Sequence, residues 1–434
     1  MLLRILFFAL MVFPFAGTTL NAQTSTLDNQ IASKASAINN EVIEWRRHFH
    51  ENPELSNREF KTAERIAEEL RALGLPVDTG IAHTGVIAVL DSGKPGPVIG
   101  LRADIDGLPV TERVDIPLAS NQTTKYLGED VGIMHACGHD THIAMLLGTA
   151  KILVDMKDQL NGKVVFVFQP AEEGAPIGEE GGAKLMVKEG IIEKYGIEVF
   201  FGQHISSGVE AGHINYKLGG IMAAADSYTI KVKGKQTHGS RPWAGVDPVT
   251  VSAQIIQGLN NIVARQTDLT KEAAVISVGK IKGGFRNNII PEEVELIGTI
   301  RTLDTDMQDI IHEKIRKTAT AIAESAGATA EVDIRIGYPV TFNNIDLTRK
   351  MVPTLMRAAG EDNVHIVPAV TGAEDFSFFA EKVPGLYFFT GGKDPSGEIP
   401  AYPHHTPDFY IDESGMETGV RAMTMLTLDF MGVK

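Results

Sequence analysis

Residues 164–174 read VVFVFQPAEEG, an apolar run that leads into a proline, two adjacent glutamates and a glycine. A short apolar run that ends in turn residues predicts a strand over 164–168. Similar runs occupy 86–90, 98–101 and 199–201, and apolar residues at helical spacing occupy 141–156. Strands that alternate with helices predict an α/β domain with a mainly parallel sheet.

Elements of the same kind flank this region. Apolar residues recur at helical spacing over 38–73, with a break near Pro53 and a stop at Gly74, and predict two amphipathic helices. Near the C-terminus the sequence predicts strands at 365–370 and 386–389 and a closing helix at 415–431.

A second pattern interrupts the first near Asp226. It predicts, in order, a strand at 227–232, a helix at 248–265, strands at 274–281 and 293–302, a helix at 307–326 and a strand at 328–336. This β-α-β-β-α-β order is the ferredoxin-like arrangement. We therefore expect a catalytic domain made of residues 23–224 and 337–434, with an inserted α+β domain at 225–336.

The N-terminus has the pattern of a secretory signal peptide over residues 1–22. Arg4 precedes an apolar stretch at 5–15, and the small residue Ala22 suits cleavage. The stretch is shorter than the ~20 residues that a membrane-spanning helix needs. We therefore expect no stable membrane anchor and a secreted or periplasmic mature chain.

Charge and cysteine content exclude several classes of function. The chain has 40 Lys and Arg against 55 Asp and Glu, a net charge of −15. No Lys/Arg-rich run stands out, which argues against nucleic acid or an anionic membrane as the partner. The single cysteine, Cys137, excludes an intramolecular disulfide and a thiolate-only zinc site. In an oxidising compartment a lone thiol needs burial or a metal.

The chemically reactive side chains follow predicted strands or lie in loops near them. They are Asp104 and Asp106, Glu172 and Glu173, His204, the segment HACGHDTH at 135–142 and the segment YPHHTP at 402–407. Ligands of open α/β sheets bind beyond the carboxyl ends of the strands. We therefore expect these groups to converge at one edge of the sheet.

Their chemistry points to a transition metal. Cys137 and His139 are one residue apart, so both can face one cation if their loop is extended, and a thiolate, imidazoles and a carboxylate together suit Zn²⁺ or a similar ion. Glu172 and Glu173 point in different directions, so one can bind metal while the other acts as a base. Each residue alone is commonly an ordinary surface or core residue. Their joint occurrence favours metal-assisted hydrolysis.

The segments MHACGHD at 134–140 and QPAEEG at 169–174 resemble a known family, the co-catalytic metallopeptidases related to aminoacylase and carboxypeptidase G. Within it they are similar to the amidohydrolase branch, which includes auxin-conjugate hydrolases and hippurate hydrolase. The resemblance runs from about Trp45 to the C-terminus and includes NIIP at 288–291, TGAEDF at 371–376 and HTP at 405–407.

The resemblance implies a site for two divalent metal ions (Mn, Zn, Co or Ni) with Glu172 as general base. The implied ligands are Cys137, His139, Glu173, His204 and His405. His404 is the alternative to His405, which is preferred because it directly precedes the Thr-Pro pair of the branch.

One position departs from the wider family. There the first ligand is a histidine two residues before an aspartate, whereas here Arg102 precedes Asp104. Arginine cannot ligate a cation. The amidohydrolase branch has the same departure, with the Cys137-x-His139 pair supplying ligands instead.

By the same resemblance the inserted domain is a lid and dimerisation domain, so we expect a homodimer. His238 would reach the neighbouring active site to stabilise the oxyanion, and Asn288 would help to hold the substrate. One donor aimed at an oxyanion contributes about 3 kcal/mol.

The reaction that the resemblance implies is hydrolysis of an N-acyl amino acid, or a related amide, to a carboxylic acid and a free amino acid. A metallo-exopeptidase acting on dipeptides would share the same site and stays open. A non-catalytic exported protein that binds an amide or peptide is disfavoured, because a binder needs no free base. The sequence does not fix the acyl group, the amino acid or the metal.

Overall fold

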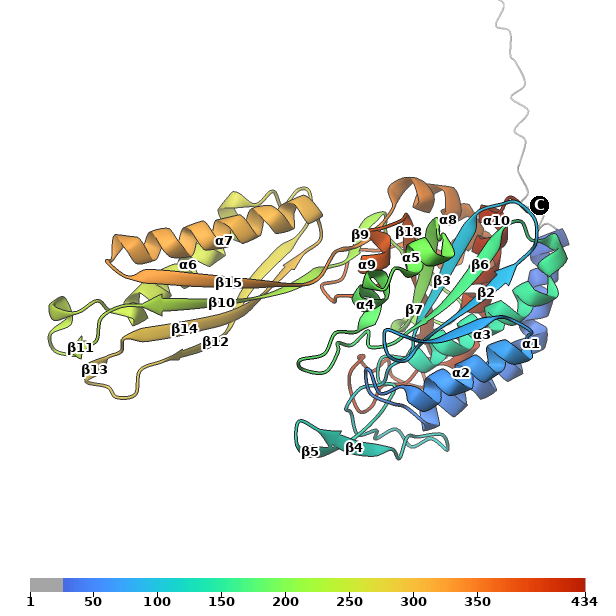
Figure 1. Cartoon of the computed structure of the whole chain (residues 1–434), viewed down its shortest axis with the longest axis horizontal. Helices are drawn as coiled ribbons and strands as arrows, with labels where there is room; N and C mark the ends of the chain where they lie inside the picture. The colour runs from blue at the N-terminus through green and yellow to red at the C-terminus, as the bar shows by residue number, and fades with distance from the viewer. Residues whose placement is uncertain (1–25, 434) are drawn as a thin grey trace, which may run out of the picture.

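The computed structural model describes residues 26–433, which form two lobes joined by two long strands (Figure 1). The predicted signal peptide, residues 1–22, lies outside the described residues. Within residues 26–433 no helix is both long and apolar enough to cross a membrane.

An eight-stranded sheet forms the larger lobe, in the order β1-β2-β6-β3-β7-β18-β8-β17. Its strands are β1 (Val77–Ile81), β2 (Gly85–Asp91), β6 (Lys163–Gln169), β3 (Val98–Asp104), β7 (Val199–Glu210), β18 (Gly385–Lys393), β8 (Ile214–Tyr216) and β17 (Val364–Ile366). The central strands β6, β3, β7 and β18 run parallel, whereas β2 pairs with β6 and β8 pairs with β18 in antiparallel fashion. The predicted α/β sheet is confirmed, with antiparallel strands added toward both edges.

Strand β6 explains why its sequence is apolar without interruption. Val164, Phe166 and Phe168 pack on one face of the sheet, and Val165 and Val167 pack on the other. A strand covered on both faces needs apolar side chains at every position. Burial of each such side chain stabilises the fold by roughly 1.5–3 kcal/mol.

Helices cover both faces of the sheet (Figure 1). One face packs against α1 (Thr26–Glu51), α2 (Phe60–Ala72), α3 (His139–Asp155), α8 (Ile345–Ala359) and α10 (Met416–Phe430). The other face packs against α4 (Gly182–Lys188), α5 (Ile191–Tyr195) and α9 (Ser377–Ala380). This layering places the carboxyl ends of the central strands at one uncovered edge, where side chains can meet a ligand.

Some elements differ from the sequence-based expectation. Helix α8, which contains Pro353, was not predicted, and neither was the hairpin of β4 (Thr123–Tyr126) and β5 (Glu129–Gly132). The strand predicted at 365–370 is wrong over its second half, because β17 ends at Ile366. Pro368 follows and has no backbone N–H to continue a ladder.

The smaller lobe confirms the predicted β-α-β-β-α-β order. Its elements are β10 (Ala224–Lys233), α6 (Pro248–Gln266), β12 (Ala274–Gly283), β14 (Glu293–Thr302), α7 (Thr305–Ser325) and β15 (Thr329–Tyr338). The strands form an antiparallel sheet in the order β12-β14-β10-β15. Helices α6 and α7 share one core with one face of this sheet, which leaves its other face open.

The two strands that join the lobes are fastened to each other near the larger lobe. Ala225 of β10 pairs with Tyr338 of β15. The buried carboxylate of Asp226 accepts a hydrogen bond from the Gly337 backbone N–H at 3.1 Å and lies 2.7 Å from His312 Nε2 of α7. The connection is therefore a paired and side-chain-braced ribbon.

A buried ion network fixes the start of α3 against α1. Arg46 Nε lies 2.7 Å from Asp140 Oδ2, and His50 lies 2.9 Å from the same oxygen through Nδ1 and 3.1 Å from Glu112 Oε1 through Nε2. Burial and Arg46 lower the pKa of His50, but the carboxylates of Asp140 and Glu112 outweigh them and raise it above its ordinary value. A protonated His50 can donate to both carboxylates.

Candidate metal centre

The structure brings the five candidate ligands together around Cys137. Its Sγ lies 3.4 Å from His204 Nε2 and 3.2 Å from His405 Nε2. Glu173 Oε1 lies 3.0 Å from His405 Nε2 and 3.9 Å from His139 Nε2. Two donor trios share the thiol, Cys137 with His139 and His204 and Cys137 with Glu173 and His405, and within each trio the donor atoms lie within 4.8 Å of one another.

The local backbone differs from the expected extended loop. Cys137 lies in a turn, Gly138 follows at φ 90°, and His139 is the first residue of α3. A Cβ at Gly138 would lie 2.3 Å from Ile205 Cγ2, so only glycine fits. The expectation that both ligands lie in an extended loop is therefore wrong. His204 lies inside β7, which continues to Glu210, and does not follow a strand end.

Hydrogen bonds orient two of the imidazoles. His204 Nδ1 donates to the backbone carbonyl of Ile205 at 2.6 Å, and His139 Nδ1 lies 3.2 Å from Asp106 Oδ1. Each contact engages Nδ1 and leaves Nε2 directed toward the donor cluster. Metal-binding histidines are commonly oriented in this way, by a carbonyl or carboxylate that binds the other ring nitrogen. His139 Nε2 is buried without a hydrogen-bond partner among the described residues.

The same reasoning separates His404 from His405. His404 Nε2 accepts a hydrogen bond from the Ser207 backbone N–H at 3.3 Å, and its Nδ1 lies 3.2 Å from the Cys137 carbonyl oxygen. Both nitrogens of His404 are therefore engaged. His404 Nδ1 also lies 3.6 Å from Cys137 Sγ, but His405 Nε2 lies closer to this sulfur, at 3.2 Å, and 3.0 Å from Glu173 Oε1, so the geometry favours His405 as the ligand.

The cluster has a strongly negative environment. Burial lowers the pKa of His139, but Asp104, Asp106 and Glu173 raise it to about 10. Burial, together with Glu173, raises the pKa of the Cys137 thiol well above its usual range. Divalent cations would supply the positive charge that this site needs, and one thiolate, three imidazoles and a carboxylate suit transition ions. The donor set therefore fits the metal pair that the sequence predicts.

Glu172 is placed as a free carboxylate beside this cluster. Its Oε2 lies 3.9 Å from His139 Nε2, and no described residue donates a hydrogen bond to its carboxylate. Its backbone is held instead, because its N–H donates to Asp106 Oδ1 at 3.1 Å and its carbonyl accepts from the Tyr338 hydroxyl at 2.7 Å. Burial, with the nearby Glu374 and Glu173, raises the pKa of Glu172 well above its usual range.

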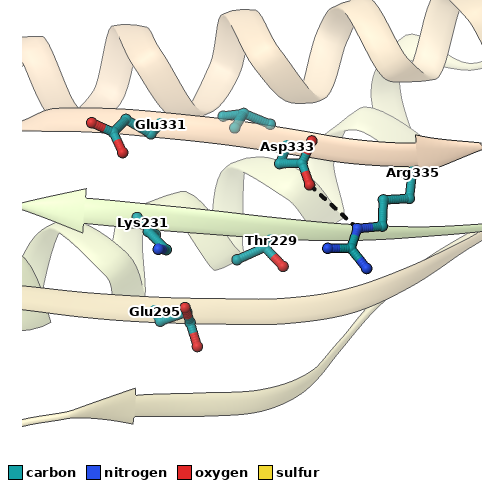
Figure 2. A pocket seen from close by; sticks show the side chains of 7 residues that line it. Thr229, Lys231, Glu295, Glu331, Asp333 and Arg335 are labelled. Atoms are coloured by element: carbon teal, nitrogen blue, oxygen red, sulfur yellow. Dashed lines mark ion pairs between the residues drawn. The ribbon is translucent and has the colours of Figure 1, made fainter. Parts of the chain in front are cut away.

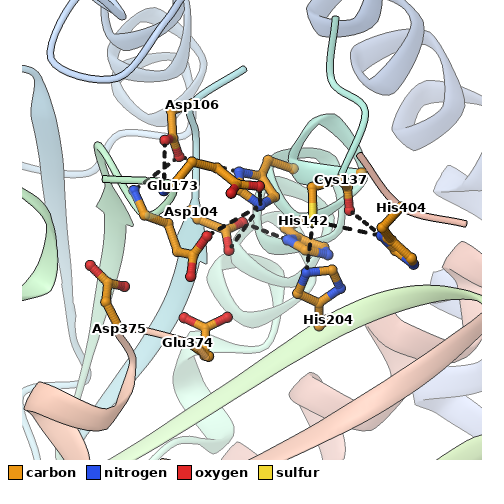
Figure 3. A network of polar contacts seen from close by, with 12 residues as sticks. Asp104, Asp106, Cys137, His142, Glu173, His204, Glu374, Asp375 and His404 are labelled. Carbon is orange, nitrogen blue, oxygen red and sulfur yellow. Dashed lines mark hydrogen bonds and ion pairs between the residues drawn. The ribbon is translucent and has the colours of Figure 1, made fainter. Parts of the chain in front are cut away.

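Arg102 has a structural role that the sequence did not predict. Its fully buried guanidinium donates to Asp104 Oδ2 at 2.8 Å, Glu374 Oε1 at 2.7 Å and Asp375 Oδ1 at 2.9 Å. The positive charge of Arg102 thus offsets the negative charges of carboxylates from two segments that are far apart in the sequence. Figure 3 shows the acids Asp104, Asp106 and Glu173 on one side of the network and the imidazoles of His142, His204 and His404 on the other.

Asp106 was expected near the site, but the sequence assigned it no role. Its Oδ2 accepts from the Glu173 backbone N–H at 3.0 Å and the Ser56 hydroxyl at 2.7 Å, while its Oδ1 faces His139 and the Glu172 N–H. The signal was present in the sequence, because Asp104 ends an apolar strand and Asp106 lies two residues beyond it. The sequence did not indicate that Asp106 contacts His139 and the backbone of both Glu172 and Glu173.

A cavity of about 480 Å³, which we call the catalytic cavity, opens at the donor cluster. Cys137, Glu172 and His405 line one end of it. Beyond them its walls are mainly apolar and include Ile205, Val209, Met222, Val367, Val370 and Phe389. Neither Lys nor Arg lines it among the described residues. The cavity can therefore enclose an uncharged group next to the metal ligands.

His238 and Asn288 lie elsewhere in the same chain. His238 belongs to β11 (Thr237–His238), and Asn288 precedes β13 (Ile289–Ile290), with the Asn288 carbonyl accepting from the Gly239 N–H at 2.8 Å. Both segments lie at the end of the smaller lobe that is farthest from the sheet with the donor cluster (Figure 1). Within one chain the structure does not bring them to the metal ligands. Their expected role in a neighbouring active site stays a prediction.

A separate depression of about 430 Å³ lies on the open face of the smaller sheet. Figure 2 shows charged side chains of neighbouring strands there, with Arg335 paired to Asp333 at 3.6 Å. Lys231, Glu295 and Glu331 also line it. No described trio of metal donors lies in this depression, so it does not compete with the cluster around Cys137 as a metal centre.

Comparison with known proteins identifies the family. The sequence profile of Peptidase family M20/M25/M40 matches residues 100–429. The chain belongs to this family. The thermostable carboxypeptidase 2 of Saccharolobus solfataricus is 40% identical over 407 residues, which cover 93% of this chain and 99% of the relative. The N-acetyl-L-cysteine deacetylase of Bacillus subtilis is 34% identical over 381 residues, 88% of this chain and 86% of the relative.

A solved structure agrees with this assignment. The YXEP protein of Bacillus subtilis, described as a dinuclear metal binding peptidase from the M20 family, matches with a TM-score of 0.76 and 32% identity, covering 92% of this chain and all of that one. The family resemblance predicted from the motifs is confirmed. The M20 family member described here is a metal-dependent hydrolase of amide or peptide bonds, which sets aside the alternative of a non-catalytic binding protein.

Proposed function

We propose that this M20 family member hydrolyses N-acyl amino acids to a carboxylic acid and a free amino acid. The observation that carries the proposal is the arrangement around Glu172. Its carboxylate receives no hydrogen bond from residues 26–433, stands beside two overlapping donor trios and opens on a mainly apolar cavity. A binding site has no need of such a free base, whereas hydrolysis requires one.

The metal pair is part of this proposal. Cys137, His139 and His204 would hold one divalent ion, and Cys137, Glu173 and His405 would hold the second. When bound, the ions polarise the amide oxygen and acidify a water molecule. Manganese, zinc, cobalt and nickel all accept this mixture of thiolate, imidazole and carboxylate.

Glu172 performs the proton transfers in the proposed reaction. It accepts a proton from the attacking water and delivers it to the nitrogen of the leaving amine. Its carboxylate lies beside the donor cluster, with Oε2 3.9 Å from His139 Nε2, and no described residue donates a hydrogen bond to it. Asp106 and Tyr338 hold the backbone of Glu172 during these transfers.

Charge around the site favours an N-acyl group over the free amine of a dipeptide. An N-terminal ammonium would need a carboxylate that is free to pair with it. Within the part of the chain that the structure describes, the acids that line the catalytic cavity are Glu172 and Glu173 of the centre and Glu374, which already binds Arg102. The remaining walls are apolar, so an uncharged acyl group fits better.

The relatives support two substrate classes. The name of the deacetylase from B. subtilis matches N-acyl amino acids, whereas the name of the carboxypeptidase from S. solfataricus, which is 40% identical, favours peptides. A metallo-exopeptidase that cleaves dipeptides is therefore the second candidate function.

The inserted domain and the N-terminus extend the proposal. The chain would form a homodimer through its smaller lobe, and His238 and Asn288 of each subunit would complete the other subunit's site. The distal position of both residues supports this arrangement, since they cannot serve as expected within their own chain without a large displacement.

The sequence pattern of residues 1–22 supports export, so the mature enzyme would act outside the cytoplasm.

A substrate panel tests the function directly. The chain is loaded in turn with Mn²⁺, Zn²⁺, Co²⁺ or Ni²⁺ and assayed with N-acetyl amino acids, N-benzoyl amino acids and dipeptides. We expect N-acyl amino acids to have the highest kcat/KM, and a chelated and dialysed sample to lose activity. Hydrolysis of dipeptides alone would establish the second candidate function, and undiminished activity after metal removal would refute the metal assignment.

A further inference from the structure

A second hollow, which we call the hairpin groove, adjoins the metal centre. It has a volume of about 790 Å³, and Glu173 lines both this groove and the catalytic cavity. The groove is bounded by the loop after α1, by the β4–β5 hairpin and by residues 173–177. Both volumes lie in the range of ligand sites. An amide held at Glu173 can therefore extend one half into each space.

The hairpin carries an unusual residue at its turn. Tyr126 pairs with Glu129, so Leu127 and Gly128 form a two-residue turn, and both have positive φ, 51° and 93°. Such turns favour asparagine, aspartate or glycine, because a bulky side chain is unfavourable in the left-handed region. Leu127 is also 73% exposed, so no packing in the free chain compensates for this conformation. A residue that suits neither its backbone nor its surroundings points to a functional contact.

Another wall of the groove presents a second exposed apolar residue. Ile177 lines the groove and is 88% exposed. Two large apolar side chains that stand open at the rim of one groove indicate a surface that becomes covered by an apolar ligand.

Cations outnumber acids in the lining of the groove, with Arg58, Lys61 and Lys125 against Glu54 and Glu173. Lys61 lines it and has no ion pair or hydrogen bond with any described residue. Of the two acids, Glu173 belongs to the metal centre, and Glu54 accepts hydrogen bonds from the backbone N–H and hydroxyl of Thr62 at 2.9 and 3.0 Å. The groove thus combines an apolar rim with a free cation, whereas the catalytic cavity has no lysine or arginine. The amino acid released by the proposed reaction matches both features of the groove. Its side chain can contact the apolar rim, and its carboxylate can face the cation.

We propose that the hairpin groove binds the amino-acid half of the substrate and selects large apolar side chains such as those of leucine, phenylalanine and tryptophan. Leu127 and Ile177 contact the side chain, and Lys61 attracts the carboxylate. The acyl half occupies the catalytic cavity. This inference rests on the proposed function, and it adds the specificity of the site.

The first test compares kcat/KM for N-acetylphenylalanine with that for N-acetylglycine. In Leu127→Asn and in Ile177→Ser the ratio should fall about tenfold, as expected for lost contacts in an apolar pocket. Leu127→Asn should unfold at the same or a higher temperature than wild type, because asparagine suits the turn. Leu269→Ser is the matched control, since Leu269 is 52% exposed and lines neither space, and it should leave the ratio unchanged.

The second test does not depend on turnover. Calorimetric titration of the full chain with free L-phenylalanine should give a Kd that Leu127→Asn and Lys61→Met both increase, the latter up to about fivefold, while Lys61→Arg preserves it. If the wild type binds L-phenylalanine in this manner but cleaves no N-acyl amino acid, the proposed function fails and the groove assignment stands.

Two results would overturn the assignment of the groove. In one, the substrate ratio and the Kd are the same in the groove variants as in Leu269→Ser. In the other, the groove variants lose activity on N-octanoylglycine and keep the wild-type ratio, which would assign the groove to the acyl half.

Discussion

Replacing Asp106 by asparagine should weaken metal binding although Asp106 is not a ligand in either donor trio. Its two oxygens face four donors, His139 Nδ1 and the Glu172 N–H at one oxygen, and the Glu173 N–H and the Ser56 hydroxyl at the other. An asparagine keeps only one acceptor oxygen. Its NH₂ group must then face one of these two pairs, whichever way the amide is turned.

The magnitude follows from the bonds that are lost. A buried N–H left without an acceptor costs about 1–3 kcal/mol, so the free energy of unfolding of the metal-free protein should fall by about that amount. Loss of a partner that orients a metal-binding histidine typically weakens metal binding or activity by about 10–100-fold. Turnover at saturating metal should fall less than metal affinity, because every ligand and Glu172 are retained.

Competition with a chromophoric chelator measures the affinity, and denaturant unfolding measures the stability. Asp91→Asn is the matched control, because Asp91 is an exposed strand-end aspartate that bonds the Gly93 N–H and pairs with Lys163 away from the centre. If Asp106→Asn holds metal as tightly as Asp91→Asn, the orientation of His139 does not depend on Asp106 and the reasoning is wrong.

Three further predictions address the ligands, the second subunit and pH. His405→Asn should release metal whereas His404→Asn should retain it, as measured by metal content after dialysis, and the reverse result would exchange the two assignments. Glu172→Gln and His238→Ala should each be nearly inactive with metal bound. If sites are shared across a two-fold dimer, co-expression of the two variants should recover up to about one quarter of wild-type activity. No recovery would argue against shared sites. Because the pKa of His50 is raised, its contribution to stability is present below its unfolded pKa of about 6.5 and is lost as pH rises through the higher folded value. The free energy of unfolding, measured with denaturant across this pH range, should show that loss in the wild type. The His50→Gln variant should not show it.

The fold was predictable where apolar residues dominate. Strand β14 and the helices of the smaller lobe follow the period of their apolar residues, and Asp247 and Asp304 cap those helices. The β4–β5 hairpin could not be recognised in this way, because its strands are short and largely exposed. Helix α8 was missed because it carries Pro353, a residue that usually argues against a helix interior.

The site was predictable to the level of residue type. A thiol, imidazoles and acids near strand ends indicate a metal, and the motifs name the ligands. The family resemblance favoured His405 and left His404 as the alternative, because the geometric distinction depends on the backbone groups of Ser207 and Cys137 that engage His404. Backbone donors and acceptors leave no mark in the sequence. Arg102 illustrates the same limit, since its partners Glu374 and Asp375 are distant in the chain.

The ribbon between the lobes makes the larger lobe sensitive to mechanical strain. Tyr338 ends β15, is paired with β10, and donates its hydroxyl hydrogen bond to the carbonyl of Glu172. If the smaller lobe moves relative to the larger one, this hydrogen bond would carry the displacement to the backbone of the candidate base. The smaller lobe is long and the Tyr338 hydroxyl lies at its base. A large movement of the distal end of this lobe would therefore produce only a small displacement at the metal centre.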